Sequence, residues 1–327
     1  MYGYEHPIEI QASNVKISGF TIASDGGSIL ATGYRVQIVG NKIATGLLVN
    51  GRYQNVSQNA LTRGVGCYGS FNTIAGNCIE GEGIIVGGSS GSSNMIYNNI
   101  VTDGNGISLI DYDKPTEANG NTVFNNTVKN CSSGLVVWLN GYSSNNTVYH
   151  NNFIGNNQST WINMDYGEFL DNGKEGNYWS DYAGKDTNGD GVGDTPQGKD
   201  RYPLMYHWGT PEVAVIGLEN ATYAGSVPLN FTVSKPTQWM GYSLDGDDNV
   251  TLTGNTTVTG IANGLHNLTV YAIDVYGTSG ASETIYFSVA KETEPEPFPT
   301  VPVAAVSTAL AAVACVGILF YFKKHKH

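Results

Sequence analysis

Residues 72–79, NTIAGNCI, carry a phrase that recurs through the first half of the chain and decides its fold. Aligned copies share an apolar residue, then an Asn three positions later, then a second apolar residue, as in Ile74, Asn77 and Ile79. The first apolar residues of successive copies lie 18 to 27 residues apart, and such a period is typical of a solenoid. The other six copies are NVKISGFTI (14–22), RVQIVGNKI (35–43), QNVSQNAL (54–61), NMIYNNIV (94–101), NTVFNNTV (121–128) and NTVYHNNF (146–153).

The spacing inside the phrase predicts a corner. Two residues five apart in a straight strand point to opposite faces, so Ile74 and Ile79 both face a core only if the chain bends between them. Asn tolerates left-handed backbone and hydrogen-bonds its neighbours, which suits Asn77 and its counterparts to that bend; Phe20 takes the place in the first copy. Stacked coils would also align these Asn side chains into a hydrogen-bonded ladder. We therefore expect a right-handed parallel β-helix.

Composition fits a turn-dense β protein and excludes some partners. Charged residues make up only 13% of the chain and glycine is abundant at 42 residues. The formal net charge of −12 argues against nucleic acid as a partner. Cysteine is sparse and forms no CxxC motif; Cys67 and Cys78 could pair across coils, or the thiols could be free and buried.

The C-terminal end predicts export and membrane anchoring. Residues 303–322 are free of charge and long enough to span a bilayer, and three lysines follow them. The positive-inside rule then leaves the last residues in the cytoplasm and the bulk of the chain outside. A sorting signal exchanged for a lipid anchor is the alternative. Ten N-x-S/T sequons, five of them within 212–290, suggest an exported glycoprotein, with an unmodified Asn-rich surface as the alternative. The N-terminus opens directly into a coil without a signal segment, so we expect the N-terminal part to be missing.

An acidic loop beyond the repeats has calcium-binding spacing. Asp186, Asn188, Asp190 and Asp194 offer side-chain oxygens at alternate positions, and the Val192 carbonyl would complete the set of Ca²⁺ ligands. Position 12 of such a loop is Gln197 instead of Glu, and no helical pattern flanks it, so the site is not an EF-hand and would bind weakly. A plain Asp/Gly-rich surface turn is the alternative. Aromatic residues around the loop predict a cap over the open end of the solenoid.

Residues 212–290 follow a different pattern. Short apolar-alternating runs separated by turn residues, such as VPLNFTV (227–233), are typical of an immunoglobulin-like β-sandwich. The sequence thus predicts an all-β protein with one C-terminal transmembrane helix. Its parts are a β-helix (1–176), a cap (177–211), an immunoglobulin-like β-sandwich (212–290), an acidic Pro-rich linker (291–301), a membrane helix (302–322) and a basic tail (323–327).

These motifs together resemble a known family. The NTxxxN coils followed by NYWSDY (177–182), the Asp-rich loop and a Tyr-Pro-Leu segment are similar to the NosD-like, carbohydrate-binding and sugar-hydrolase group of right-handed β-helix proteins. The likeness to surface proteins of archaeal type extends over nearly the whole chain. The NosD name implies copper delivery in the periplasm, but copper needs His, Met or Cys clusters, and His150 and His207 are isolated in the sequence.

Three functions stay open at this point. Asp103, Asp111 and Asp113 are the candidate catalytic carboxylates for a lyase or glycoside hydrolase acting on uronate-type polymers, or else belong to a solvated loop. A carbohydrate-binding or adhesive protein would stack sugars on aromatic residues and pair acidic sugars with arginines. A purely structural envelope component needs only the column, the spacer and the anchor. The candidates for sugar binding are Tyr34, Tyr53, Tyr68, Tyr97, Tyr112 and Trp138, with Arg35, Arg52 and Arg63.

Overall fold

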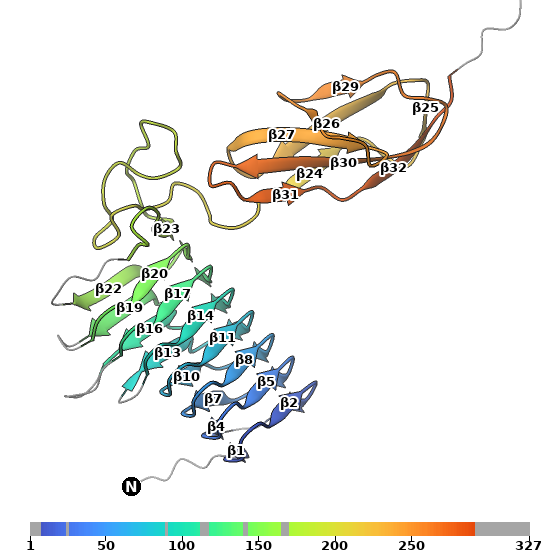
Figure 1. Ribbon diagram of the computed structural model, residues 1–327. Helices are drawn as coiled ribbons and strands as arrows, with labels where there is room; N and C mark the ends of the chain where they lie inside the picture. The colour runs from blue at the N-terminus through green and yellow to red at the C-terminus, as the bar shows by residue number, and fades with distance from the viewer. Residues whose placement is uncertain are drawn as a thin grey trace, which may run out of the picture. The chain divides into compact units, whose positions relative to one another are not determined.

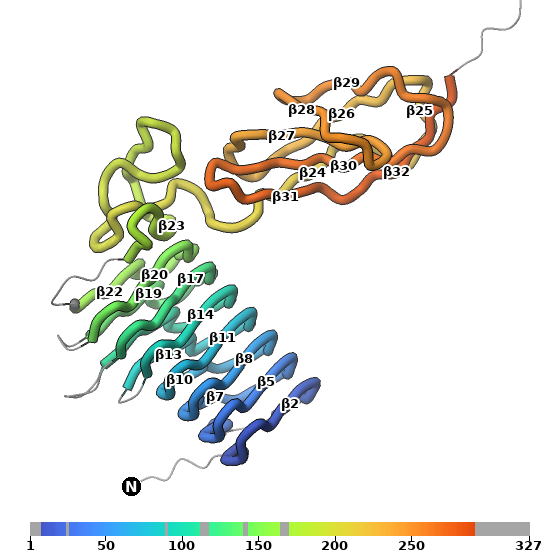
Figure 2. Tube along the Cα trace, in the orientation of Figure 1, coloured from blue at the N-terminus to red at the C-terminus, as the bar shows by residue number. Residues whose placement is uncertain are grey.

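The computed structural model describes residues 8–23, 26–88, 91–111, 118–139, 143–164 and 170–291. Its first part is a column of stacked coils, seen in Figures 1 and 2, and each coil contributes one strand to each of three parallel sheets. This confirms the all-β parallel β-helix of right-handed type. The described residues contain no α-helix.

The strands of each sheet follow the coils in chain order. Sheet A contains β1 (Ile8–Ile10), β4 (Ser28–Ala31), β7 (Gly46–Val49), β10 (Val65–Cys67), β13 (Ile84–Gly87), β16 (Ile107–Ile110), β19 (Ser133–Leu139) and β22 (Gln158–Met164). Sheet B contains β2 (Lys16–Ser18), β5 (Gln37–Val39), β8 (Asn55–Ser57), β11 (Thr73–Ala75), β14 (Met95–Tyr97), β17 (Thr122–Phe124) and β20 (Thr147–Tyr149). Sheet C contains β3 (Thr21–Ile22), β6 (Lys42–Ile43), β9 (Ala60–Leu61), β12 (Cys78–Glu80), β15 (Ile100–Thr102), β18 (Thr127–Lys129), β21 (Asn152–Ile154) and β23 (Tyr178–Trp179).

The core of the column is built from the repeated apolar positions. Ile74 in β11 and Ile79 in β12 are both fully buried, so the chain does turn between them. Each lies beside its equivalent on the next coil, Ile96 and Val101. Burying one such side chain contributes about 1.5–3 kcal/mol, and the stack repeats this gain on every coil. Cys67 is buried inside this core, whereas Cys78 is exposed, and both thiols are free.

The left-handed residue of the corner between sheets B and C is not the Asn that the phrase suggested. Backbone φ is +63° at Gly76 and +54° at Asn98, one residue before Asn77 and Asn99. The predicted conformational role of Asn77 was therefore wrong. Its side chain is buried and serves to join the coils instead.

The predicted Asn ladder is present at this corner. Asn59 donates from its backbone N and its Nδ2 to Oδ1 of Asn77, both at 3.0 Å, and Asn77 donates in the same way to Asn99. Asn77 Nδ2 also donates to the carbonyl of Val56 at 2.9 Å. Every polar group of the buried amide is thus paired, which buried amides require. A second ladder, which the phrase did not predict, runs along the corner between sheets A and B through Gln54, Asn72, Asn94, Asn121 and Asn146.

Residues 170–206 close the end of the column. Trp179 is buried and stacks on Phe153 of the last full coil, with ring centroids 4.3 Å apart. The Asn ladder ends at Asn177, whose backbone N donates to Oδ2 of Asp200 at 2.8 Å. Trp179 Nε1 donates to the same oxygen at 2.8 Å. Burial raises the pKa of Asp200 to about 6, although these hydrogen bonds act to lower it.

The remaining strands form two further sheets. One has the order β24 (Val213–Ile216), β26 (Val227–Val233) and β29 (Thr256–Val258). The other contains β25 (Thr222–Tyr223), β32 (Ile285–Val289), β30 (Gly264–Asp274), β27 (Thr237–Leu244) and β28 (Val250–Thr251), with β31 (Ser279–Ala281) paired to β30. The immunoglobulin-like assignment stays a prediction.

The chain divides into two compact units. The first is Met1–Ala214 with Thr232–Gly241 and Val270–Ser282; the second is Val215–Phe231, Tyr242–Thr269 and Glu283–His327. In the part of the chain that the structure describes, no helix is long and apolar enough to cross a membrane. The predicted membrane helix (302–322) and basic tail (323–327) lie outside the described residues.

Candidate functional site

The corner between sheets A and B carries a row of exposed aromatic rings on three successive coils. Tyr34, Tyr53 and Phe71 are 40%, 46% and 41% exposed. The ring centroids of Tyr34 and Tyr53 lie 5.3 Å apart, and Tyr53 stacks on Phe71 at 5.0 Å with nearly parallel planes. Arg35 lies over the ring of Tyr34 and Arg52 over that of Phe71, with each Cζ about 5 Å from the ring centroid. We call these five residues the aromatic–arginine corner.

Hydrogen bonds show that the same corner position is used on every coil. The residue at this position donates its backbone N–H to the carbonyl that precedes the equivalent position on the next coil. Examples are Arg35 N to Arg52 O at 3.0 Å and Phe71 N to Ser92 O at 3.0 Å. The full set of equivalent residues is Asn14, Arg35, Tyr53, Phe71, Ser93, Gly120 and Asn145, all with φ between +55° and +64°.

This position requires left-handed backbone, which is unfavourable for Arg35, Tyr53 and Phe71. Left-handed backbone brings Cβ close to the following carbonyl oxygen and costs about 1–2 kcal/mol for residues other than Gly, Asn and Asp. Asn14, Gly120 and Asn145 are the residue types that avoid most of this cost. Three consecutive coils therefore place large side chains where the backbone favours small ones.

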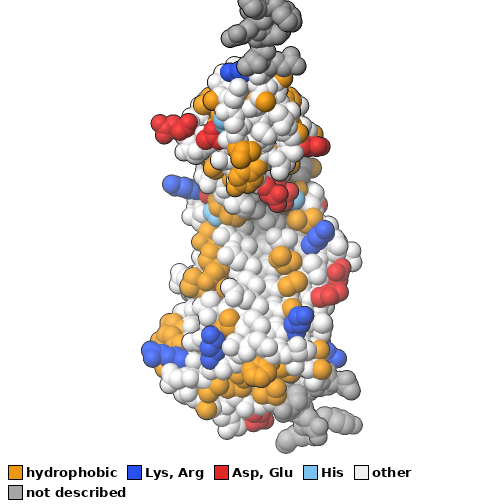
Figure 3. All heavy atoms as spheres, turned by 90° about the vertical axis from the view of Figure 1, so that its right-hand side faces the viewer, with side chains coloured by type: hydrophobic (Ala, Val, Ile, Leu, Met, Phe, Trp, Pro, Cys, Tyr) orange, Lys and Arg blue, Asp and Glu red, His pale blue; other side chains and the backbone are white. Residues whose placement is uncertain are grey.

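The same coils are basic in an acidic protein. Between Ile10 and Ile79 the chain has one acid, Asp25, which lies outside the described residues, and five cationic residues: Lys16, Arg35, Lys42, Arg52 and Arg63. On the face drawn in Figure 3, Lys and Arg side chains lie next to hydrophobic ones toward the N-terminal end of the column. Within the described residues no salt bridge reaches Arg35 or Arg52. Both guanidinium groups are exposed and have donors free for an anion.

Two other aromatic groups lie on the outside of the column. Trp138 of β19 and Trp161 of β22 are 39% and 50% exposed, with centroids 5.1 Å apart in an edge-to-face pair on sheet A. On sheet B, Tyr97, Phe124 and Tyr149 stack in a row on successive coils but are half-buried. Tyr68 is also half-buried, and Tyr112 lies outside the described residues. The sequence-based candidates included six of these aromatics but missed Phe71, Phe124, Tyr149 and Trp161.

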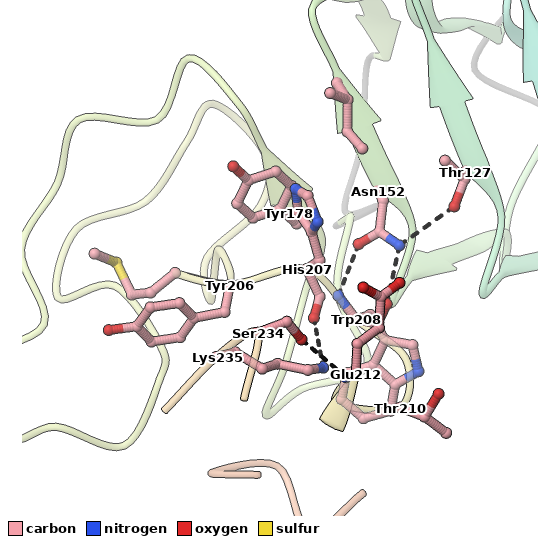
Figure 4. Close-up of a pocket in the computed structure, with 12 residues that line it drawn as sticks. Thr127, Asn152, Tyr178, Tyr206, His207, Trp208, Thr210, Glu212, Ser234 and Lys235 are labelled. Carbon is pink, nitrogen blue, oxygen red and sulfur yellow. Dashed lines mark hydrogen bonds between the residues drawn. The ribbon is translucent and has the colours of Figure 1, made fainter. Parts of the chain in front are cut away.

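The first compact unit also contains a pocket of about 400 Å³, shown in Figure 4. Its polar groups are engaged by the chain itself. Asn152 accepts from Trp208 N at 2.7 Å and donates to Trp208 O at 3.0 Å, and Lys235 Nζ donates to His207 O at 2.9 Å. Burial, and after it the charge of Lys235, lowers the pKa of His207. Because these donors and acceptors are already paired, the pocket serves packing better than ligand binding.

The three candidate carboxylates do not form one group in the described structure. Asp103 and Asp111 lie at opposite ends of β16, and Asp113 lies outside the described residues. Asp111 is buried and accepts a hydrogen bond from Ser143 Oγ at 2.9 Å. Asp103 is exposed in an open groove that is also lined by Arg63 and Glu82.

In the predicted calcium loop, the side-chain oxygens accept hydrogen bonds from N–H groups of the loop itself. Asp186 accepts from the N–H groups of Gly189 and Gly191 at 2.7 and 2.9 Å, and Asp190 accepts from that of Val192 at 2.9 Å. Asp194 accepts from Thr187 N at 3.0 Å, and Asn188 Nδ2 donates to Asp190 at 2.9 Å. Among the described residues, no three His, Cys, Asp or Glu side chains converge as metal ligands. The structure therefore does not support the calcium site and is compatible with the Asp/Gly-rich surface turn.

Copper does not fit the residues that the structure describes either. His150 Nε2 lies 2.8 Å from a Glu175 carboxylate oxygen, and the His150 ring stacks on Trp208. Cys67 is buried, and burial raises the pKa of its thiol to about 12, so the thiolate that copper binds is disfavoured. His207 faces the ring of Tyr178. Each of these side chains is thus engaged or buried separately, and together they do not offer copper a ligand set.

Comparison with known proteins places the column in a family. A family model described as "Periplasmic copper-binding protein (NosD)" matches residues 4–184. A "Probable ABC transporter binding protein NosD" of Pseudomonas aeruginosa is 33% identical over 130 residues, which are 39% of this chain and 26% of that protein. The protein of the same name from Stutzerimonas stutzeri is 34% identical over 128 residues, again 39% and 26%. This chain thus aligns with about a quarter of the length of either relative. Because the family model covers more than half of the chain, the protein belongs to the family of periplasmic copper-binding proteins, NosD.

Proposed function

We propose that this protein binds carbohydrate outside the cytoplasm and uses its coils as a rigid platform for an extended polysaccharide. The observation that carries the proposal is the row of exposed rings Tyr34, Tyr53 and Phe71 on successive coils. Exposed aromatic side chains are costly to leave in water and favour contact with the apolar C–H groups of sugars. A parallel β-helix repeats such a contact about every 4.8 Å, a distance close to the length of one pyranose residue.

Location outside the cytoplasm is part of the same proposal. The family description is periplasmic, and the sequons and the apolar tail support export and anchoring of this chain. In this arrangement residues 212–290 act as a spacer that holds the column away from the bilayer. A structural role in the envelope is compatible with carbohydrate binding, because a column that binds envelope glycans also reinforces them.

A glycan array with the purified full-length protein tests the proposal. We expect binding to one class of extended polysaccharide without release of new chain ends. A Tyr286→Ser variant is the control for loss of an exposed aromatic residue elsewhere in the chain. Tyr286 of β32 is 62% exposed but lies outside the column, so this variant should bind glycans as the wild type does. Failure of the wild-type protein to bind any glycan would contradict the proposed function.

A second candidate, cleavage of an acidic polysaccharide, rests on the open groove beside sheet C. Arg63, Glu82 and Asp103 line it, so one of the predicted carboxylates shares a groove with a second carboxylate and a cation. Arg63 and Glu82 lie 4.0 Å apart and both are exposed. The groove is open to solvent, which gives little of the water exclusion that strengthens catalytic charges. Chain cleavage that is lost in an Asp103→Asn variant would favour catalysis over binding alone.

A further inference from the structure

The aromatic–arginine corner presents two features that folding alone does not explain. Tyr53 and Phe71 have φ of +58° and +60° at a position that other coils fill with Asn14, Ser93, Gly120 or Asn145. The rings are more than 40% exposed, so they are not needed to fill the core. Sparsely populated backbone conformations cluster at functional sites, which makes this corner a candidate for one.

The arginines indicate the charge of the ligand. Arg35 also occupies the left-handed position, with φ of +55°, and Arg52 directly precedes Tyr53. Each guanidinium group lies over an aromatic ring, which orients its plane and reduces the conformational freedom lost on binding. Between Ile10 and Ile79 the sequence has five cationic residues and one acid, Asp25, which lies outside the described residues. A planar guanidinium recognises a carboxylate through two parallel hydrogen bonds.

We propose that the aromatic–arginine corner is the binding site for a uronate-containing polysaccharide that lies along the axis of the column. The sugars pack along the solvent-exposed edges of the rings of Tyr34, Tyr53 and Phe71, and sugar carboxylates pair with Arg35 and Arg52. This inference rests on the proposed carbohydrate-binding function and specifies the acidic substrate class and the residues.

Binding of the full-length protein to polygalacturonate, to alginate and to neutral dextran, measured by calorimetry, tests the proposal. We expect binding to at least one of the two acidic polymers that weakens as salt is raised, and no comparable binding to dextran. Tyr53→Asn and Phe71→Asn install the residue type that other coils use. Combined, they are expected to weaken binding about tenfold or more, because aromatic anchors dominate such contacts. The unfolding midpoint is expected to stay within about 3 °C of wild type or to rise. Arg35→Gln with Arg52→Gln is expected to remove the preference for acidic over neutral polymers.

The possible results separate this inference from the proposed function. Equal binding of acidic polymers by wild type and the Tyr53→Asn, Phe71→Asn variant would overturn the inference and leave carbohydrate binding intact. Binding of neutral glycans alone would do the same. Binding of phosphatidylglycerol vesicles without any uronate polymer would overturn the inference in favour of a lipid surface. A large fall in the unfolding midpoint of the Asn variant would show that the rings serve the fold, and it would also overturn the inference.

Discussion

The two corners that flank sheet B both turn the chain sharply between strands, but they use different residues to do so. Both turn the chain at a left-handed residue, and both join the coils through a ladder of buried amides. The corner between sheets B and C has Gly or Asn at the left-handed position on most coils and Gln58 and His150 on two others. The corner between sheets A and B uses Arg35, Tyr53 and Phe71 on three coils. The first corner therefore mostly carries residues that the left-handed backbone favours, whereas the second carries large side chains on three consecutive coils, where exposed rings and cations gather.

The difference indicates that the residues that hold the coils together and the residues available for binding lie at separate positions of the coil. The buried amide just after each corner is constrained by its neighbours on two coils, so it admits little change. The left-handed residue before it is exposed on most coils, although His150 is buried, and an exposed side chain there is free to vary at a modest energetic cost. Function in this column is thus expected at left-handed corner positions, and structural failure is expected at the amides.

The largest effect is expected from the ladder. Asn77→Leu removes the acceptor of two Asn59 donors and the donor of the Val56 carbonyl in a dry interior. Each unsatisfied buried group costs about 1–3 kcal/mol, so we expect a loss of roughly 4 kcal/mol or more in the free energy of unfolding. Urea denaturation monitored by circular dichroism measures this. Thr73→Val, on the outer side of the same coil, is the control and should change stability little.

The second effect comes from the cap and depends on pH. The folded pKa of Asp200 is about 6, above the ordinary value of 3.8, so between these values the folded protein holds a proton that the unfolded chain has released. The contribution of Asp200 to the free energy of unfolding is therefore highest below about pH 4 and falls as pH rises through 6. At about 1.4 kcal/mol per pH unit of pKa shift, the total fall is on the order of 3 kcal/mol.

Unfolding curves of wild type and Asp200→Asn between pH 4 and 7.5 test this. The difference in stability between the two proteins is expected to shift in favour of the variant as pH rises. Asp181→Asn, which removes an exposed carboxylate of the same cap, should preserve the wild-type pH dependence. A constant difference between wild type and Asp200→Asn would show that the buried carboxylate does not titrate in this range.

A smaller loss of stability is expected when a large side chain is placed at the left-handed position of the corner between sheets B and C. Gly76→Phe places a bulky residue at φ +63°, where the nearest atom to an added Cβ is Gln58 Cγ at 3.8 Å. Space is available, so the expected cost is that of the left-handed backbone, about 1–2 kcal/mol. Urea denaturation measures it, with Gly76→Asn as the control that should be nearly neutral. A neutral Gly76→Phe variant would remove the physical basis for treating Tyr53 and Phe71 as costly.

The sequence predicted the coil and part of its corner for identifiable reasons. The five-residue spacing of Ile74 and Ile79 requires a bend, and the recurrence of Asn77 predicts a ladder, because both depend on the repeat alone. The phrase did not reveal that Gly76 is the left-handed residue, since Asn and Gly are both suited to that conformation. The second ladder was overlooked although Asn72, Asn94, Asn121 and Asn146 begin four copies of the phrase. Their burial depends on the path of the sheet A strand in each coil, and the repeated phrase does not include that strand.

The candidate site was predictable only in outline. Tyr34, Tyr53, Arg35 and Arg52 were candidates from their spacing, but nothing in the sequence pattern separated them from ordinary surface residues. Phe71 becomes informative only once its backbone is known to be left-handed. The sequence also did not show that Asp103 and Asp111 are separated by β16, and Asp113 lies outside the described residues. The calcium spacing does not by itself distinguish a metal site from a plain turn, because turns rich in Asp and Gly satisfy their own N–H groups with the same oxygens.

The most direct test of a binding role for the aromatic–arginine corner is the free energy of unfolding of Phe71→Asn. If the ring is held for a ligand, the relief of left-handed strain offsets the lost stacking on Tyr53, and stability should stay within about 1 kcal/mol of wild type or exceed it. If the ring instead holds the fold together, stability should fall by about 3 kcal/mol or more, as for a buried Phe. Urea denaturation at constant pH distinguishes the two, and the second result would contradict a binding role for this corner.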